Sequence, residues 1–500
     1  MRCVALAQAW QDAGGNVVFA MAESTPAIDA RLRSNGMEIV QLRAAPNTLQ
    51  DARDVSALAS GRHATWVVVD GYQFDSAYQR SLKDAGLKLL FVDDLGQCEQ
   101  YSADLVLNQN VHASEYMYAS REAYTRLLLG PRFAMLRRDF RRWSRWQREI
   151  IPNGRRVLVT MGGSDPDNIT AIVLQALHAV KIDGLDVIAV LGGSNPHFGF
   201  LERFANHSPP VRFLRDAANM PELMAWADIA VSAAGSTCAE MCLLRLPAIL
   251  LDLATNQVPV AQELGRRRAA IHLGSSKAVT AAEIAGSVQS LLLWKELRAS
   301  LSLRCRELVD GEGAERVMAA IQGRDLRLRR VRRNDCRQLW EWANDPEVRP
   351  VSFATEPIPW ERHVEWFNAK LCDPNAVLYL VVDAGDVPAG QVRYQINSRR
   401  AAVSISLAPQ FRGKGYGEVV LAMATEDLFR TTDVTQIDAY VKPNNTASLR
   451  LFTRAGSARE GTEMIGAHQA IHFVLEKTMD RYQRQEEMDL GSLCSVDKTT

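Results

Sequence analysis

The first 140 residues alternate between short apolar runs and helical segments. The apolar runs predict strands in VVFAMA (17–22), EIVQL (38–42), ATWVVVD (64–70), LKLLFVDD (87–94) and ADLVLNQ (103–109). These runs are apolar throughout, which is typical of strands in a parallel sheet that helices cover on both faces. The chain itself opens on a helix, because residues 1–13 place Val4, Leu6 and Trp10 on one side.

A second α/β block follows. Its predicted strands lie in RRVLVTMGGSD (155–165), DVIAVLGGSN (186–195), VRFL (211–214), ADIAVSAAGS (227–236), LPAILLD (246–252) and AAIHLG (269–274). A charged segment with Pro-Asn-Gly, residues 137–156, separates the two blocks and is typical of a linker. Two consecutive α/β blocks with a cleft between them are common among enzymes of nucleotide-activated sugars, and ligands bind beyond the carboxyl ends of such strands.

The pattern changes after Gly323. The segment LRLRRVRRNDCRQLWEWAN (326–344) is basic and rich in Trp, and antiparallel-looking strands follow in VLYLVVD, AGQVRYQI, AVSISLA, IDAYVKP and AIHFVLEK. We therefore expect an α/β chain with parallel sheets followed by an α+β unit. Its predicted parts are 1–145, 155–323, 325–480 and a polar tail at 481–500, which we expect to be disordered.

Composition narrows the functional classes. Lys+Arg and Asp+Glu both number 58 among 500 residues, so a net charge of zero argues against bulk binding of nucleic acid. No apolar run reaches about 18 residues and no signal peptide precedes the first helix, so we expect no membrane partner and a cytoplasmic location. Eight scattered cysteines fit a reducing compartment. Cys238 and Cys242 have no nearby histidine, so small buried side chains are the better interpretation than zinc, and we expect no metal.

One glycine turn stands between a strand and a helix in VSAAGSTCAE (231–240). Amides at a helix start attract phosphate, and Gly235 lets a backbone or ligand come close. Ser236 or Thr237 can cap the helix or donate to a phosphate oxygen, and Glu240 can accept from ribose hydroxyls. The alternative is a plain capping box between the hydroxyl and the carboxylate.

Two further polar turns follow strands of the same block. In MGGSDPDNIT, Gly162 and Gly163 permit a close approach, and Asp165 or Asp167 can cap the next helix. In LATNQ, the amide of Asn256 and that of its neighbour Gln257 could read a base or a sugar hydroxyl, although Asn is also a common helix cap. The turns together predict a ligand site at one edge of the sheet.

The third unit carries a sharper signal in QFRGKGYG (410–417). Arg412 is followed by glycines at 413, 415 and 417, between an apolar strand and a helix. Successive amides at such a helix start can wrap a pyrophosphate. Asn445, Ser448 and Phe452 come about thirty residues later, in NNTASLRLFTRAGS, and should lie on one helix near that loop.

Residues 325–480 resemble the GNAT family of acetyl-coenzyme A-dependent N-acetyltransferases. The resemblance implies that the RGKGYG loop, with Arg412, Gly413, Gly415 and Gly417, together with Asn445 and Ser448, binds acetyl-CoA. It further implies that a bulged strand ending at Leu407 pairs with the pantetheine arm. Many members protonate the departing thiolate with a Tyr where this chain has Phe452, which cannot donate a proton. His363 and Glu356 could face the acceptor amine, or lie on a surface helix.

Residues 1–323 resemble a UDP-sugar hydrolase of pseudaminic acid biosynthesis with a MurG-like, GT-B-like fold. The matching stretches include VDGYQ, FVDDLGQCEQYSADLVLNQN, LLLGPRFAMLRRDF, MGGSDP, SAAGSTCAE and TNQ. The resemblance implies that water displaces UDP from 2,4-diacetamido-2,4,6-trideoxy-β-L-altropyranose. It implies substrate contacts for Tyr72 and Asn256, and a UDP site formed by Gly163, Ser164, Gly235, Ser236, Thr237 and Glu240.

In that family a strand, a glycine turn and a general-base His precede the Met-Arg-Cys that here begins at Met1. We therefore expect the first strand and this His to be absent from the 500 residues, and the first sheet to have a gap or an exposed edge. The sequence predicts a bifunctional enzyme that N-acetylates a UDP-amino-sugar and hydrolyses the product. Two alternatives stay open: a UDP-sugar-binding module fused to an acetyltransferase, and a MurG-like glycosyltransferase. The oligomeric state is not predicted.

Overall fold

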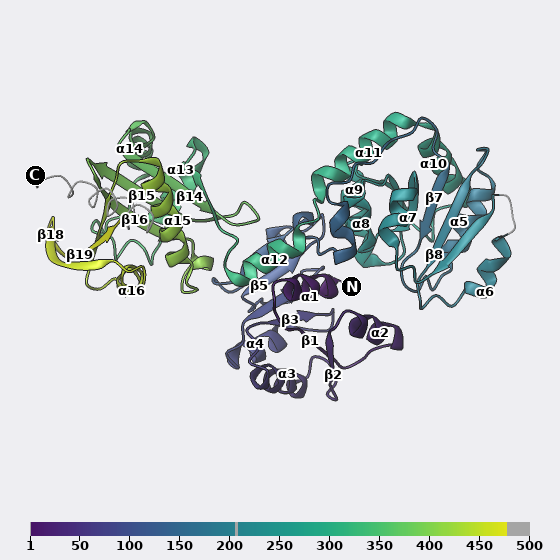
Figure 1. The fold of residues 1–500 in the computed structure, drawn as a ribbon, viewed down its shortest axis with the longest axis horizontal. Helices are drawn as coiled ribbons and strands as arrows, with labels where there is room; N and C mark the ends of the chain where they lie inside the picture. The colour runs from purple at the N-terminus through teal and green to yellow at the C-terminus, as the bar shows by residue number, and fades with distance from the viewer. Residues whose placement is uncertain (1, 206–208, 478–500) are drawn as a thin grey trace, which may run out of the picture. The chain divides into compact units, whose positions relative to one another are not determined.

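The computed structural model of the protein describes residues 2–205 and 209–477. Its contacts divide the chain into two units, Met1–Arg324 and Asp325–Thr500 (Figure 1). The expected disorder of the tail at 481–500 concerns residues outside those described. The two-domain division of the first unit stays a prediction. No helix within 2–205 and 209–477 is long and apolar enough to cross a membrane.

The first half of unit 1 contains every strand predicted there and one more. Its elements are α1 (Arg2–Asp12), β1 (Val18–Met21), α2 (Pro26–Ser34), β2 (Glu38–Gln41), α3 (Leu49–Gly61), β3 (Val67–Asp70), α4 (Ser76–Asp84), β4 (Leu89–Val92), β5 (Leu105–Asn108) and β6 (Arg126–Leu129). The strand β6 was not predicted, because its four residues are set among polar turns.

The strands of this half form two sheets. Strand β1 pairs in parallel with β2, and a separate parallel sheet has the order β3-β4-β5-β6. No ladder joins β1 to β3 among the residues that the structure describes. The expected interruption of the first sheet is therefore present, between these two strands.

The second half of unit 1 is one six-stranded parallel sheet in the order β12-β11-β10-β7-β8-β9. Its elements are β7 (Arg156–Thr160), α5 (Ile169–His178), β8 (Asp186–Leu191), α6 (Phe198–Leu201), β9 (Val211–Arg215), α7 (Met220–Trp226), β10 (Ile229–Ala233), α8 (Thr237–Leu243), β11 (Ala248–Asp252), α9 (Val258–Arg266), β12 (Ile271–Ser275), α10 (Ala281–Leu293), α11 (Lys295–Leu308) and α12 (Gly313–Gln322). All six predicted strands are confirmed.

Both faces of this sheet are buried, as the continuous apolar runs predicted. Val157 and Val159 pack on one face with α5 and α10, whereas Leu158 between them packs on the other with α7, α8 and α9. Alternate residues of a strand point to opposite faces, so a strand that helices cover on both sides has to be apolar at every position.

The last helix of unit 1 returns to the first half. Helix α12 packs against α1 and against the 3₁₀ turn Pro131–Phe133. A Cβ added to Gly313 would lie 2.2 Å from the carbonyl oxygen of Ala134, so only glycine permits this approach. Arg316 also donates to the carbonyl oxygen of Arg132. Residues at the end of unit 1 thus help to complete the packing of its beginning.

Unit 2 is built on a seven-stranded sheet in the order β13-β14-β15-β16-β17-β19-β18. Its elements are β13 (Arg327–Arg330), α13 (Cys336–Ala343), α14 (Trp360–Cys372), β14 (Ala376–Val382), β15 (Pro388–Asn397), β16 (Arg400–Leu407), α15 (Tyr416–Thr431), β17 (Gln436–Val441), α16 (Thr446–Arg454), β18 (Ala458–Ile465) and β19 (His468–Glu476). Neighbouring strands are antiparallel except β16 and β17, which are parallel.

Two strands of unit 2 escaped the sequence analysis. Strand β18 is exposed at nearly every position, and β13 at the sheet edge has one leucine among three arginines, so neither has an apolar run. The buried cysteines agree with the prediction, because Cys238 and Cys242 are free thiols and both are 5% exposed.

Candidate functional site

A hydrogen-bonded cluster in unit 1 contains both residues that the sequence marked as substrate contacts. Tyr72 follows β3, and its hydroxyl donates to Asp94 Oδ2 at 3.0 Å. Asn256, in the turn after β11, donates through Nδ2 to the same hydroxyl at 3.2 Å. The two predicted residues, 184 positions apart in the chain, therefore meet directly. Burial and the Asp94 carboxylate raise the pKa of Tyr72.

Asp94 is the centre of this cluster, and the sequence analysis did not single it out. Besides Tyr72, it accepts hydrogen bonds from Arg2 NH1 at 2.7 Å and from Asn110 Nδ2 at 2.6 Å. Arg2 also pairs with Asp70 at 2.7 Å. The only sequence signal was the position of Asp70 and Asp94 at or just after strand ends, where ligands of parallel sheets bind.

His112 is a second residue that the sequence analysis missed. Its ring lies near Asp94 and near Glu263 of α9, and its Nδ1 atom is buried without a hydrogen-bond partner among the described residues. Burial lowers the pKa of His112 below its ordinary value, against the opposing effects of a hydrogen bond to the Asp94 backbone and of the two carboxylates. A neutral imidazole with a free nitrogen can accept a proton.

The neighbour of Asn256 has a local role. Gln257 accepts a hydrogen bond from the amide of Leu253 through its side-chain oxygen at 3.0 Å. This bond closes the turn after β11 and leaves the amide of Asn256 pointing to Tyr72.

Two glycine turns lie against each other at the strand ends of the second half. Gly163 and Ser164 are exposed after β7, and a Cβ on Gly192, after β8, would lie 2.1 Å from the Gly163 carbonyl oxygen. Asp165 accepts the amides of Ile169 and Thr170 at 2.8 and 3.0 Å, so it caps the start of α5 as predicted. The turns bring their backbones together at one edge of the sheet.

The turn after β10 does not form the capping box that was the alternative interpretation. Ser236 makes no capping hydrogen bond to the seven-residue helix α8, and Glu240 instead contacts Arg137 at 3.4 Å. Gly235 and Thr237 are half-buried there, and Ser236 is exposed. Burial raises the pKa of Glu240, which Arg137 only partly offsets.

The glycine loop of unit 2 joins β16 to α15. Gly413 and Gly415 have φ of +70° and +84°, a conformation that strains any residue with a side chain. Arg412 donates to the Leu407 carbonyl at 2.8 Å. It also forms ion pairs with Asp345 at 3.0 Å and with Glu347 at 2.8 Å. This arginine fixes the shape of the loop, which leads directly into the start of α15, where the helix dipole favours an anion.

Strands β16 and β17 separate beside this loop. Their ladder ends at the pair Ala402↔Asp438, although the strands continue to Leu407 and Val441. The resemblance implied a bulge in β16, but its ladder with β15 has no register shift from Gly390↔Leu407 onward. The opening is formed instead by divergence from β17, which leaves residues 403–406 of β16 without a paired strand on that side.

Helix α16 lies next to the loop, as expected. Leu451 Cδ1 is 3.3 Å from the position of a Cβ on Gly417. Asn445 caps this helix by accepting the Ser448 amide at 3.1 Å. Phe452 is 5% exposed and stacks on Phe473 at 5.9 Å between ring centroids, so its position is in the core.

The two residues suggested for the acceptor side differ in position. His363 is 3% exposed and packs against the rings of Trp366 and Phe367, and burial lowers its pKa. Glu356 is exposed in the loop before α14. The surface interpretation does not fit the buried imidazole of His363, and the acceptor-facing interpretation stays a prediction.

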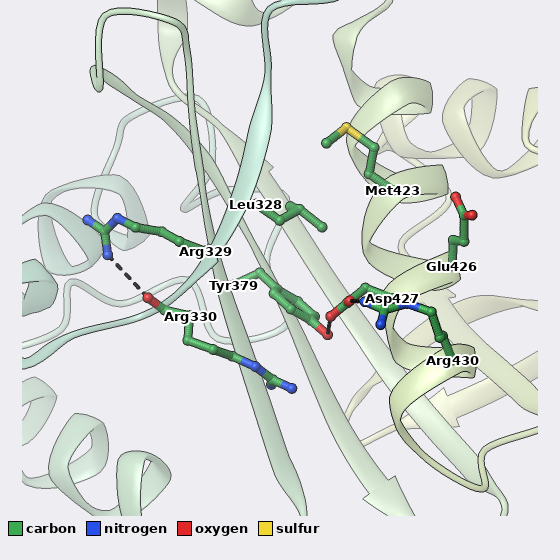
Figure 2. Close-up of a pocket in the computed structure, with 8 residues that line it drawn as sticks. All are labelled: Leu328, Arg329, Arg330, Tyr379, Met423, Glu426, Asp427 and Arg430. Carbon is green, nitrogen blue, oxygen red and sulfur yellow. Dashed lines mark hydrogen bonds and ion pairs between the residues drawn. The ribbon is translucent and has the colours of Figure 1, made fainter.

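A separate cavity of about 430 Å³ lies between β13, β14 and the C-terminal part of α15 (Figure 2). Tyr379 points across it and donates to Asp427 at 2.5 Å, and Arg430 also pairs with Asp427 (Figure 2). The Arg330 guanidinium lies 4.6 Å from the centroid of the Tyr379 ring. The charges of this cavity are thus largely compensated, and it lies away from the glycine loop at the other end of α15.

Similarity to known families covers both units. Residues 325–458 match the acetyltransferase (GNAT) domain, and residues 156–296 match the glycosyltransferase family 28 C-terminal domain. Within 2–205 and 209–477, no group of three or more His, Cys, Asp or Glu side chains is arranged to hold a metal ion.

Three relatives indicate the breadth of the similarity. An uncharacterised protein of Methanocaldococcus jannaschii is 21% identical over 478 residues, which are 91% of this chain and 92% of that protein. The spore coat polysaccharide biosynthesis protein SpsG of Bacillus subtilis is 28% identical over 47% of this chain and 68% of its own length. A UDP-N-acetylglucosamine–N-acetylmuramyl-(pentapeptide) pyrophosphoryl-undecaprenol N-acetylglucosamine transferase of Symbiobacterium thermophilum is 31% identical over 34% of this chain and 46% of its length. The chain therefore joins a GT-B-like region, which carries a glycosyltransferase family 28 C-terminal domain, to a GNAT acetyltransferase domain.

Proposed function

We propose that the protein is a bifunctional enzyme of nonulosonate biosynthesis of the pseudaminic acid type. Unit 2 transfers acetyl from acetyl-CoA to the amine of a UDP-4-amino-sugar. Unit 1 binds the resulting UDP-2,4-diacetamido-2,4,6-trideoxy sugar and releases UDP from it by hydrolysis. The observation that carries the proposal is the presence, on one chain, of an acetyltransferase (GNAT) domain and a glycosyltransferase family 28 C-terminal domain.

The acetyl-CoA site of the proposal is the glycine loop with the adjacent opening. The pyrophosphate lies on the amides of residues 413–417 at the start of α15, where the helix dipole favours an anion. The pantetheine arm extends along residues 403–407 of β16, whose ladder with β17 has ended. Asn445 and Ser448 contribute from the start of α16 at the side of the loop.

The UDP-sugar site of the proposal lies at the strand ends of unit 1. The uracil nucleotide contacts the turns of Gly163 and Ser164 and of Gly235 to Thr237, with Glu240 toward the ribose. The sugar contacts Tyr72 and Asn256, which already share a hydrogen bond. Water attacks the anomeric carbon, the bond to UDP breaks, and the proton passes to the free nitrogen of His112.

The experiment follows both products with the purified chain. The UDP-linked 2-acetamido-4-amino-2,4,6-trideoxy-β-L-altropyranose is supplied with acetyl-CoA, and free thiol and free UDP are measured separately. We expect thiol to appear first, and UDP release to depend on prior acetylation. The absence of both free thiol and free UDP contradicts the proposal.

The similarity to the N-acetylglucosamine transferase favours a second candidate for unit 1, sugar transfer to a hydroxyl acceptor. The same nucleotide contacts serve in that reaction, with an acceptor hydroxyl in place of water. UDP release that requires an added sugar or lipid-linked acceptor supports transfer, whereas release in buffer alone supports hydrolysis. Binding of UDP without any release supports a binding module.

A further inference from the structure

The acetyl transfer proposed for unit 2 leaves one proton unassigned. When the thioester breaks, the CoA thiolate has to be protonated, and the resemblance places this role at Phe452. That side chain has no proton to donate, and its position is inside the core against Phe473 and Leu421. A donor therefore has to come from another part of the opening.

Tyr440 lies at the opening between β16 and β17. It is on β17, two residues beyond Asp438, the last residue of β17 that pairs with β16. Because side chains alternate along a strand, Tyr440 shares the face of Asp438, opposite to the face on which Ala439 packs beside Phe452. The tyrosine is half-buried, and its hydroxyl makes no hydrogen bond to any residue that the structure describes.

The ring of Tyr440 is held in place by His472 on the neighbouring strand. Tyr440 and His472 are paired across the β17–β19 ladder, and their rings stack with centroids 4.7 Å apart and planes 16° apart. His472 is itself fixed at both nitrogens, since Nε2 lies 3.0 Å from Asp438 and Nδ1 lies 2.8 Å from Glu463. The ring is thus positioned while its hydroxyl stays unengaged.

The charges around Tyr440 keep its hydroxyl protonated. Burial raises the pKa of Tyr440, the Glu463 and Asp438 carboxylates raise it further, and Arg400 opposes them. Arg400 forms an ion pair with Asp438, with 2.6 Å between Arg400 NH2 and Asp438 Oδ1. A phenol with a pKa above its ordinary value carries its proton throughout the neutral range and has it ready to donate.

We propose that Tyr440 is the general acid of the acetyl transfer, an inference that rests on the acetyltransferase function proposed above. The amine nitrogen attacks the thioester carbonyl, a C–N bond forms, and the C–S bond breaks. The departing sulfur takes the phenolic proton of Tyr440. The substrate nitrogen releases one proton to water and the tyrosinate recovers one from water, so acetyl-CoA and amine give amide and CoA with no other reactant.

The test compares two leaving groups in the full-length Tyr440→Phe variant. One donor is acetyl-CoA, and the other is its selenium analogue, whose selenol is more acidic and leaves as the anion without a proton. With acetyl-CoA we expect kcat to fall by about 10²-fold, the usual contribution of a general acid. With the selenium analogue we expect a fall of less than about tenfold, because the missing proton matters little there. Calorimetry with CoA should give the wild-type affinity.

The matched control is Tyr379→Phe, which removes a phenol from the same sheet. Tyr379 lies on β14 and donates to Asp427 in the cavity of Figure 2. We expect this variant to leave the ratio of kcat with acetyl-CoA to kcat with the selenium analogue at its wild-type value. An equal loss with both donors in Tyr440→Phe, or no loss with acetyl-CoA, overturns the inference.

The same comparison separates this inference from the proposed function. Wild-type chain that does not acetylate the UDP-amino-sugar contradicts the proposed substrate. In that case the ratio of the rates with acetyl-CoA and with the selenium analogue is measured for the slow hydrolysis of the two acetyl donors. This reaction needs the same protonation of the leaving thiolate. A ratio that Tyr440→Phe does not change in that reaction overturns the assignment of Tyr440 by itself.

Discussion

At the scale of single residues, the sequence predicted two substrate-contacting residues, but not the aspartate that lies at the centre of their hydrogen-bonded cluster. Tyr72 and Asn256 were singled out from short matching stretches, whereas Asp94 lies inside a matching stretch without being singled out and His112 lies just beyond that stretch. Their importance depends on long-range geometry: Asp94 receives three side chains from distant positions, and His112 Nδ1 becomes buried without a hydrogen-bond partner only in the folded chain. Local patterns carry no record of such contacts, so this part of the site could not be predicted.

His112→Asn tests the proton acceptor of the proposed hydrolysis. We expect UDP release to slow by about 10²-fold or more, the usual contribution of a general base, because the amide does not take up a proton. UDP affinity measured by calorimetry should stay close to that of the wild type. The control is His63→Asn, an exposed residue with φ of +51°, which asparagine tolerates. Release at the wild-type rate in His112→Asn would contradict the assignment.

Glu240→Gln tests the partly buried carboxylate near Arg137. The pKa of Glu240 is raised above the ordinary 4.5, so the folded state binds more protons than the unfolded state between the two values. The free energy of unfolding therefore falls as pH rises from 4.5 through the raised pKa. Urea titrations of the variant should show a smaller fall over this window, together with weaker UDP binding. An identical pH dependence in both proteins refutes the predicted shift.

At the scale of elements, continuous apolar runs predicted the buried strands well. Of the missed strands, β13 and β18 lacked such runs, and β6 has a run of only three leucines. The opening between β16 and β17 illustrates what no run can predict. Both strands have the expected apolar pattern, but their separation after Ala402↔Asp438 depends on how the two twist relative to each other. The glycine turns were recognised by composition, whereas the contact of Gly192 with Gly163 follows from the sheet order.

Gly192→Ala tests that contact between turns. The added Cβ would lie 2.1 Å from a backbone oxygen, so one turn has to move. We expect a loss of about 2 kcal/mol in the free energy of unfolding, together with weaker UDP binding because Gly163 and Ser164 shift. The matched control is Gly199→Ala, where no atom lies within 4 Å of the new Cβ. Equal stability of the two variants is the outcome that excludes a close contact.

At the scale of the whole molecule, the boundary between Arg324 and Asp325 separates two units with their own cores. We expect fragments 1–324 and 325–500, expressed separately, to unfold cooperatively at the temperatures of two transitions in the intact chain. Differential scanning calorimetry of the three proteins provides the measurement. A fragment without a cooperative transition shows that its unit does not fold alone.

The return of α12 onto α1 has a consequence for inheritance. Recombination between two homologous genes near residue 150 joins the first half of unit 1 from one gene to the second half from the other. Helix α12 then packs against an α1 from the other homologue, with which it did not evolve. Because Gly313 leaves no room for a side chain, a small mismatch where α12 packs against the first half is expected to destabilise the hybrid. Viable hybrids should therefore exchange residues 1–324 as one block, and natural mosaics of this protein should show their breakpoints at its end.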